Sequence, residues 1–192
     1  MLSPADARLI EVQTHRPPRG IVSVAAHCPA GHPAVAHCYP LLRKAGGIEP
    51  FPTLYWLTCP RLRREISHFE RDGAITEIAG LIAGDAGLRE RLARDHEDYI
   101  ARRWATLTQD DRALVNEMGL AEQFRTRGIG GMVNRAAVKC LHLHFAHHLA
   151  AENVIGEIMI KRYGIATCAS VANAPFSGLG CSGLQSRSDD KK

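Results

Sequence analysis

The sequence predicts an α+β fold in which a small three-stranded antiparallel meander packs against a layer of five to six helices. Three observations predict this fold. Apolar residues alternate with polar ones in the first third of the chain, as in half-buried strands. From residue 61 onward they recur at spacings of three and four, as on one face of a helix. Stretches rich in proline and glycine separate these segments, and the chain contains no internal repeat.

The N-terminal part of the chain supplies the strands. Residues 4–13 predict a short helix, which the stiff sequence "RPPRG" ends. Two strands follow, "IVSVAAHC" at 21–28 and "AVAHCYP" at 34–40, and the turn residues "PAGHP" between them predict a hairpin. After an expected loop at 42–50, the apolar, aromatic and β-branched residues of "FPTLYWLTC" at 51–59 predict a third strand.

The following part of the chain predicts helices. Leu62, Ile66 and Phe69 are spaced by four and three residues, and Gly73 is a candidate C-cap for the helix that contains them. Thr108 is a candidate N-cap further along the chain. The predicted helices span residues 61–73, 74–85, 86–107, 108–124, 133–153 and 154–164.

We therefore expect a single α+β domain over residues 1–164. Beyond it, the composition shifts to Ala, Ser, Gly, Asn and Asp and ends with "SRSDDKK". Such a sequence buries too little apolar surface to offset the entropy of ordering it. Residues 165–192 thus predict a disordered C-terminal tail.

Composition excludes several classes of protein. The net charge of +4 is spread along the chain and aromatic residues make up only 6%, so we expect no nucleic-acid binding. No apolar run approaches the roughly 18 residues needed to cross a bilayer, and the N-terminus lacks the apolar core of a secretory signal. These features predict a cytoplasmic protein without a membrane partner. In that compartment the six cysteines are expected to be thiols or metal ligands.

Two of these cysteines predict one half of a metal site. In a meander the first and third strands run parallel, so Cys28 and Cys59, which end them, lie at the same edge of the sheet. A proline follows each cysteine and turns the chain away just after the thiol.

The histidine-rich sequence "VKCLHLHFAHH" at 138–148 predicts the other half. On a helix, Cys140 and His144 are four residues apart and share a face. His147 and His148 continue that face by one more turn, whereas His142 points elsewhere. A set of Cys28, Cys59, Cys140 and His144 would form the closed tetrahedral shell of a structural zinc ion.

Other interpretations stay open. An iron–sulfur cluster could use the same three cysteines, although their spacing matches no compact ferredoxin pattern. If one ligand stays off the metal, an open position would make the site catalytic, with His148 or His96 transferring protons. Cys38 lies mid-strand and is better interpreted as a small buried hydrophobe. The glycine-rich "GIGGM" at 128–132 is better interpreted as a hinge than as an anion-binding loop.

Several motifs together resemble a known family. "RPPRGIVSVAAHCPAGHPAV", "FPTLYWLTCPRLRREISHFERDG", "HEDYIARR", "GIGG" and "VKCLHLHFAHHLA" occur in order over roughly residues 16–160. They resemble the bacterial family catalogued as domain of unknown function 501. The resemblance implies no activity, but it implies that the family's cysteines fall on Cys28, Cys59 and Cys140 and its histidines on His142, His144 and His148. It also implies gene neighbours for septum formation.

Two classes of function follow. The first is a cytoplasmic metal-binding domain with zinc as the cofactor, or an iron–sulfur cluster as the alternative. The second is a non-enzymatic adaptor that binds a protein partner, linked to cell division by the resemblance, with its thiols simply buried. Whether the protein is an enzyme stays open at this stage.

Overall fold

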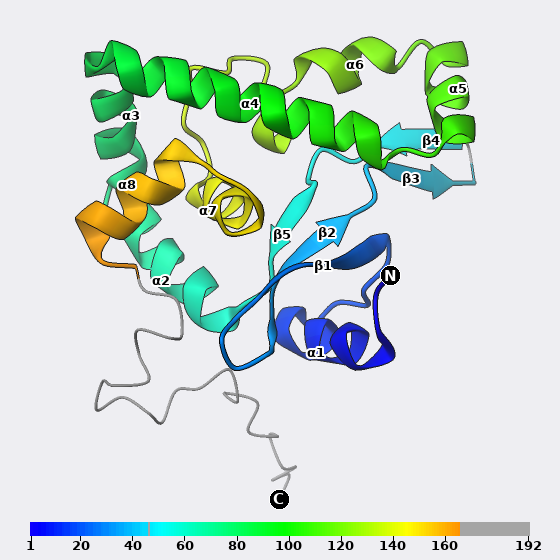
Figure 1. The fold of residues 1–192 in the computed structure, drawn as a ribbon, viewed down its shortest axis with the longest axis horizontal. Coiled ribbons are helices and arrows are strands. Elements are labelled where there is room, and N and C mark those ends of the chain that lie inside the picture. The colour runs from blue at the N-terminus through cyan, green and yellow to red at the C-terminus, as the bar shows by residue number, and fades with distance from the viewer. Residues whose placement is uncertain (46, 166–192) are drawn as a thin grey trace, which may run out of the picture.

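A computed structural model describes residues 1–45 and 47–165 of the chain, and Figure 1 shows its arrangement. The α+β class predicted from the sequence is confirmed, because helices and a small antiparallel sheet make up the described residues. The expected tail at 165–192 lies outside the described residues except for Ile165. In Figure 1, α4 runs across the top, α1 lies at the bottom beneath the sheet, and α7 and α8 lie between α4 and α2. The helices are α1 (Pro4–Thr14), α2 (Pro60–Arg71), α3 (Ala74–Gly84), α4 (Ala86–Thr106), α5 (Gln109–Glu117), α6 (Ala121–Thr126), α7 (Leu141–Ala150) and α8 (Val154–Tyr163), with a 3-10 turn η1 at Ile129–Gly131.

The main sheet contains the three predicted strands. Its order is β1 (Ile21–His27), β2 (Pro33–Cys38) and β5 (Tyr55–Leu57), and each neighbouring pair is antiparallel. The predicted loop at 42–50 is instead a second hairpin, because β3 (Leu41–Lys44) pairs with β4 (Gly47–Pro50). The third strand is also shorter than the expected 51–59.

The helices are more numerous than the expected five to six, since the described residues contain eight. One cause is the predicted helix at 108–124, which is divided into α5 and α6. Gly119 separates them with a φ of 68°, a left-handed conformation that favours glycine and ends a helix.

Helix α7 begins later than its apolar pattern predicts. The expected helix at 133–153 is wrong for residues 133–140, which form no regular helix before Leu141. Asn134 Oδ1 accepts a hydrogen bond from the Ala136 amide at 3.0 Å, a local turn that competes with helix formation. Cys140 is the N-cap in an extended conformation, with φ −135° and ψ 110°. Cys140 and His144 therefore do not share a helical face.

The core contains polar side chains from α4, α7 and α8. His96, His144 and His147 are each 0% exposed and Asn153 is 1% exposed. Asn153 Oδ1 accepts the amides of Ile155 and Gly156 at 3.0 and 3.2 Å and so caps α8. Its Nδ2 must then face His144 Nδ1 and His147 Nδ1, at 3.5 and 3.3 Å. Because an amide nitrogen only donates, both imidazoles accept at Nδ1 and carry their proton on Nε2.

Burial keeps His96, His144 and His147 neutral at pH 7. Burial lowers the pKa of His96 to about 4, of His144 to about 3 and of His147 to about 4. The Asp98 carboxylate, 3.3 Å from His147 Nε2, opposes this effect in part, whereas Arg102 adds to it. Arg135 likewise lowers the pKa of His96.

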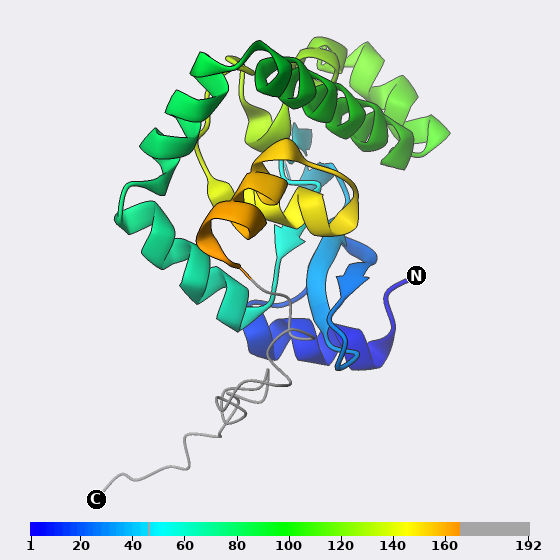
Figure 2. The same ribbon diagram turned by 60° about the vertical axis from the view of Figure 1, so that its left-hand side comes forward.

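Two close helix contacts require glycine. In Figure 2, α7 and α8 lie against each other inside the frame formed by α2, α3 and α4. A Cβ at Gly156 of α8 would lie 2.2 Å from His148 Cβ, and one at Gly128 would lie 2.2 Å from His96 Nδ1. Neither position leaves room for a larger residue.

The close approach of α7 and α8 predicts a strong effect of Gly156→Ala. We expect the variant to lose about 1–3 kcal/mol of unfolding free energy, because the new methyl group overlaps His148. Gly80→Ala is the matched control: Gly80 is helical and nothing lies within 4 Å of the place that its new methyl group would take, so we expect a gain of about 0.4–1 kcal/mol. Urea unfolding measures both. Equal effects of the two substitutions would contradict the packing of α8 on α7.

The buried histidines predict that acid destabilises the fold. The unfolded chain takes up protons near pH 6.5 while the folded chain does so only near pH 4 or below, so the unfolding free energy falls as the pH falls through this window. Each histidine contributes up to about 1.4 kcal/mol per pH unit. Asn153→Asp should make the unfolding free energy depend less steeply on pH, because a carboxylate facing His144 and His147 favours their protonated forms. Urea unfolding between pH 8 and pH 5 compares the two proteins, and identical slopes would contradict the assigned environment.

Candidate metal centre

Three side chains converge where α2 meets the start of α7. His142 Nδ1 lies 3.2 Å from Glu70 Oε1 and 3.9 Å from Cys140 Sγ. Each of the three residues is partly buried, and their ligand atoms all lie within 4.8 Å of one another. Within residues 1–45 and 47–165, this is the one group of three or more His, Cys, Asp or Glu side chains close enough to share a metal ion.

Local structure brings these atoms together. Leu62 and Ile66 bury one face of α2, and this places Glu70, one turn after Ile66, beside the start of α7. There Glu70 Oε1 accepts the Leu141 amide at 2.6 Å and caps the helix. Because Cys140 precedes the helix in an extended conformation, its thiol can lie near His142 in the first turn.

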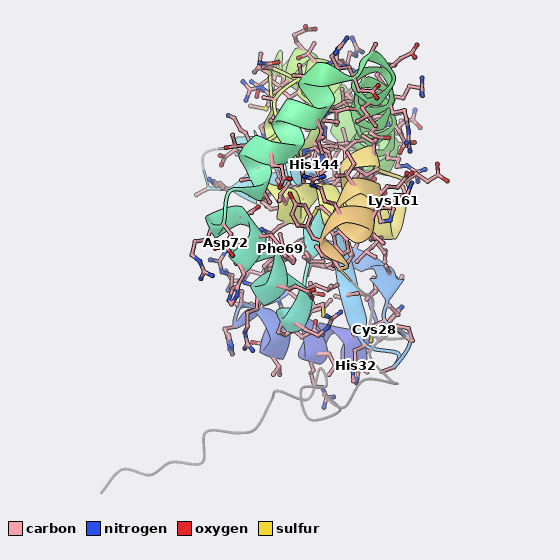
Figure 3. The ribbon with its side chains drawn as sticks, turned by 90° about the vertical axis from the view of Figure 1, so that its left-hand side faces the viewer. Cys28, His32, Phe69, Asp72, His144 and Lys161 are labelled. Atoms are coloured by element: carbon pink, nitrogen blue, oxygen red, sulfur yellow. The ribbon has the colours of Figure 1, made fainter. Side chains whose placement is uncertain are left out.

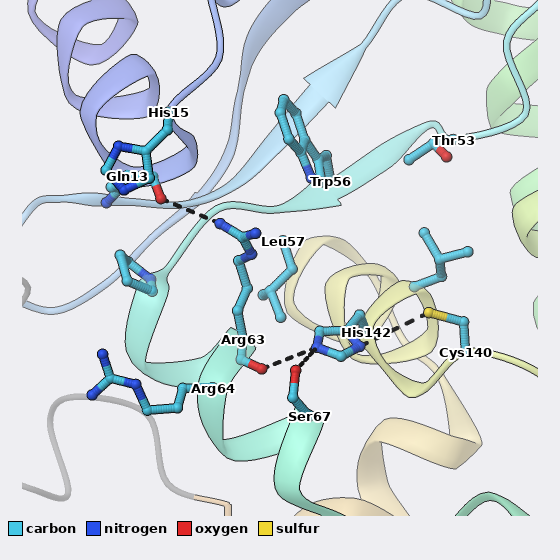
Figure 4. A pocket seen from close by; sticks show the side chains of 12 residues that line it. Gln13, His15, Thr53, Trp56, Leu57, Arg63, Arg64, Ser67, Cys140 and His142 are labelled. Atoms are coloured by element: carbon cyan, nitrogen blue, oxygen red, sulfur yellow. Dashed lines mark hydrogen bonds between the residues drawn. The ribbon is translucent and has the colours of Figure 1, made fainter. Parts of the chain in front are cut away.

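The other nitrogen of His142 is held by α2. Its Nε2 lies 3.0 Å from the Arg63 carbonyl oxygen and 3.2 Å from Ser67 Oγ (Figure 4). The carbonyl can only accept, so Nε2 carries a proton and donates it. A neutral His142 then has its lone pair on Nδ1, which faces Glu70 and Cys140. Backbone carbonyls hold metal-binding histidines in this way.

His142 differs from the histidines of the core in its charge. Burial opposes a positive charge on it, but hydrogen bonds with Cys140 and the Arg63 carbonyl, together with the Glu70 carboxylate, raise its pKa to about 9. Without a metal ion, the site thus holds a proton between His142 Nδ1 and its acceptors at neutral pH. A proton and a metal ion compete for such a site.

The geometry does not match a Cys–His–acid catalytic relay. In such a relay, the acid binds one imidazole nitrogen and the nucleophile lies at the other. Here Glu70 and Cys140 both lie at Nδ1, and Nε2 is bonded to the Arg63 carbonyl. Three ligand atoms around one point are typical of cation binding.

A cavity of about 620 Å³ opens beside the cluster. Cys140 and His142 form part of its wall, and Figure 4 shows them on the side opposite α1. Its remaining wall combines basic residues with apolar ones, namely His15, Arg63 and Arg64 with Trp56, Pro60, Leu57 and Leu143, among others.

The thiols of Cys28 and Cys59 do not join this cluster. They follow β1 and β5, which are parallel as predicted, but β2 lies between the two strands. Ala26 of β1, Val35 of β2 and Leu57 of β5 are aligned across the sheet. The ends of β1 and β5 are therefore two strand spacings apart, about 9–10 Å. Cys28 is half-buried beside the hairpin turn, and Cys59 is 1% exposed at the N-cap of α2.

His144 and His148 also lie away from Cys140. His144 is in the core next to His96, with their ring centroids 6.0 Å apart, and Figure 3 shows His144 and Cys28 at separate places in the molecule. His148 Nδ1 lies 3.2 Å from the Asn153 carbonyl oxygen. The expected set of Cys28, Cys59, Cys140, His144 and His148 is therefore not brought together, and Cys140 alone is in the observed cluster.

Helical spacing misses two residues of the cluster. It puts His142 off the face because it treats Cys140 as helical, although the family resemblance does include His142. Glu70 has no signal in the sequence, since a carboxylate near the end of a charged helix is common. One other expectation agrees with the structure: Cys38 is 3% exposed, and burial raises the pKa of its thiol to about 12. The hinge expected at 128–132 stays a prediction. In "GIGGM", the Ile129 amide donates to His96 Nδ1 at 3.0 Å and is not available to an anion.

No described helix combines the length and the apolar composition that crossing a membrane requires.

Comparisons with known proteins place the chain in a family. A search of curated proteins and a search of solved structures both found no match. The family model described as "Protein of unknown function (DUF501)" matches residues 24–161, which run from within β1 to within α8 and include all three residues of the cluster. The chain therefore belongs to the DUF501 family.

Proposed function

We propose that this chain is a zinc-binding protein in which Glu70, Cys140 and His142 hold one ion and leave its fourth position open to the cavity. The observation that carries the proposal is the convergence of a carboxylate, a thiol and an imidazole nitrogen within 4.8 Å. This set replaces the ligands expected from the sequence and retains Cys140.

The separations of the ligand atoms support zinc. Zinc bonds of about 2.3 Å to sulfur and about 2.0 Å to nitrogen or oxygen, at tetrahedral angles, put nitrogen and oxygen about 3.3 Å apart and sulfur and nitrogen about 3.5 Å apart. The observed separations are 3.2 Å between His142 Nδ1 and Glu70 Oε1 and 3.9 Å between Nδ1 and Cys140 Sγ. The third pair, Cys140 Sγ and a Glu70 carboxylate oxygen, lies within 4.8 Å, so the ligands would move toward one another on binding the ion.

The chemistry of the donors also favours zinc over other metals. One thiolate, one imidazole and one carboxylate suit a cation of intermediate softness. An iron–sulfur cluster needs several thiolates, and Cys140 is the one cysteine of this cluster. Calcium and magnesium bind oxygen ligands and would leave the thiol and the imidazole unused.

An open fourth position makes the site suited to catalysis. Three protein ligands with water in the fourth position are typical of catalytic zinc, which lowers the pKa of that water and polarises a bound oxygen. Cys140 and His142 line the cavity, so a small molecule in it would reach the ion. The Arg63 carbonyl would keep Nδ1 of His142 directed at the metal.

Ligand substitutions test the proposal. Glu70→Gln, Cys140→Ser and His142→Ala should each lower zinc affinity by about tenfold or more, because each removes one of three protein ligands. Glu70→Gln keeps an acceptor for the Leu141 amide and so preserves the helix cap. Cys28→Ser and Cys59→Ser are matched controls and should leave the affinity unchanged. Competition with a chromophoric chelator, on protein without a histidine tag, measures the affinities.

Cobalt substitution identifies the ligands directly. Cobalt in place of zinc should give a thiolate charge-transfer band that Cys140→Ser abolishes and Cys28→Ser retains. Wild-type protein that binds no zinc under these conditions would refute the proposal. Binding that survives Cys140→Ser but is lost in Cys28→Ser and Cys59→Ser would instead favour the ligands first predicted from the sequence.

A further inference from the structure

We propose that the cavity beside Glu70, Cys140 and His142 binds the dianionic phosphate group of a small organic phosphate ester, through Arg63 and Arg64. The role of the metal ion in this inference rests on the proposed function. The role of the two arginines rests on the cavity itself, so the two parts can fail separately.

The two arginines lack carboxylate partners in the described part of the chain. Arg63 Nη1 donates to the Gln13 carbonyl oxygen at 3.2 Å, and Arg64 makes no side-chain hydrogen bond or ion pair to any described residue. Their neighbour Arg61 is bound to Glu65 at 2.8 Å. None of the 12 described residues that line the cavity is Asp or Glu. Both arginines therefore line the cavity, and none of its described lining residues contributes a carboxylate.

The backbone adds to this positive potential. Pro60, the first residue of α2, lines the cavity, and Cys59 at the N-cap gives the helix no side-chain cap. The N-terminal end of a helix carries a partial positive charge. His15 adds a polar ring on the same wall.

Charge balance selects a phosphate ester over a carboxylic acid. A zinc ion held by the carboxylate of Glu70 and the thiolate of Cys140 has no net charge left. Arg63 and Arg64 then contribute two positive charges that a ligand must balance. A phosphate monoester carries about −1.5 to −2 at pH 7 and has three acceptor oxygens, whereas a carboxylate carries only −1. Planar guanidinium groups bind phosphate oxygens in pairs.

The apolar walls indicate that the phosphate belongs to an organic molecule. Trp56, Leu57 and Leu143 line the same cavity, and Trp56 is only partly buried. A volume of about 620 Å³ is in the range of small-molecule sites. An aromatic or apolar ester group can pack on these side chains while its phosphate reaches the arginines of the same cavity.

Three probes distinguish these contributions: phenyl phosphate, benzoate and inorganic phosphate. Zinc-loaded wild-type protein should bind phenyl phosphate at least about tenfold more tightly than either of the others, because benzoate has too little charge and inorganic phosphate has no apolar group. Isothermal titration calorimetry gives the affinities. Trp56 fluorescence gives an independent signal, which Trp56→Phe should remove. Equal affinities for phenyl phosphate and benzoate would overturn the proposal.

Substitutions on α2 test the two arginines. Arg63→Gln and Arg64→Gln should each weaken phenyl phosphate binding by about tenfold or more, since each removes charged hydrogen bonds. Arg71→Gln is the matched control on the same helix, because Arg71 pairs with Asp72 outside the cavity, and it should leave the affinity unchanged. Arg64 is exposed, so its variant keeps the test valid even if Arg63→Gln fails to fold.

Measurements on zinc-free protein separate this inference from the proposed function. Arginine-dependent binding of phenyl phosphate that persists without zinc supports the cavity assignment even if the zinc titration fails. Binding that is unaffected by both arginine substitutions overturns the assignment even if zinc binds through Glu70, Cys140 and His142.

Discussion

Helix α7 packs against β5, α8, α2 and β1, and the point where it begins determines where its histidines lie. It begins at Leu141 because the Glu70 carboxylate, from α2, accepts the Leu141 amide at 2.6 Å. That amide would otherwise be an unsatisfied donor beside a fully buried residue. The bond joins α2 to α7 and sets the rotation of the helix, so that Leu141 and Phe145 are buried. It also brings the carboxylate to His142, so the helix cap and the candidate metal centre share one oxygen atom.

This starting point divides the histidines of α7 into two groups with opposite electrostatics. His144 and His147 point into the core, where burial lowers their pKa and Asn153 holds them in one tautomer. His142 faces α2, where a carboxylate, a thiol and a carbonyl raise its pKa to about 9 despite burial. The first group stabilises the contact between α7, α8 and α4. At the second, a proton and a bound cation would compete for the same atoms.

Helix α2 contributes both to the candidate metal centre and to the cavity beside it. It supplies the Glu70 carboxylate, the Arg63 carbonyl that orients His142, and the guanidinium groups of Arg63 and Arg64. The sheet adds Trp56 as an apolar wall. One helix, packed through Leu62 and Ile66, thus carries negative, neutral and positive groups beside the cavity. This concentration of polar groups on one helix supports a binding role for the cavity.

The sequence by itself determined the α+β class, the three strands of the main sheet and the burial of Cys38, because these follow from local periodicity and from the small, apolar character of a thiol. It did not determine the site. Periodicity placed Cys140 inside a helix, but a tertiary contact from Glu70, 71 residues away, caps that helix where it begins, at Leu141. Strand direction brought Cys28 and Cys59 to one edge of the sheet, but β2 between them keeps them apart. Only the tertiary structure decided which side chains meet, because ligand distances of a few ångströms depend on where each helix begins and on which strands intervene.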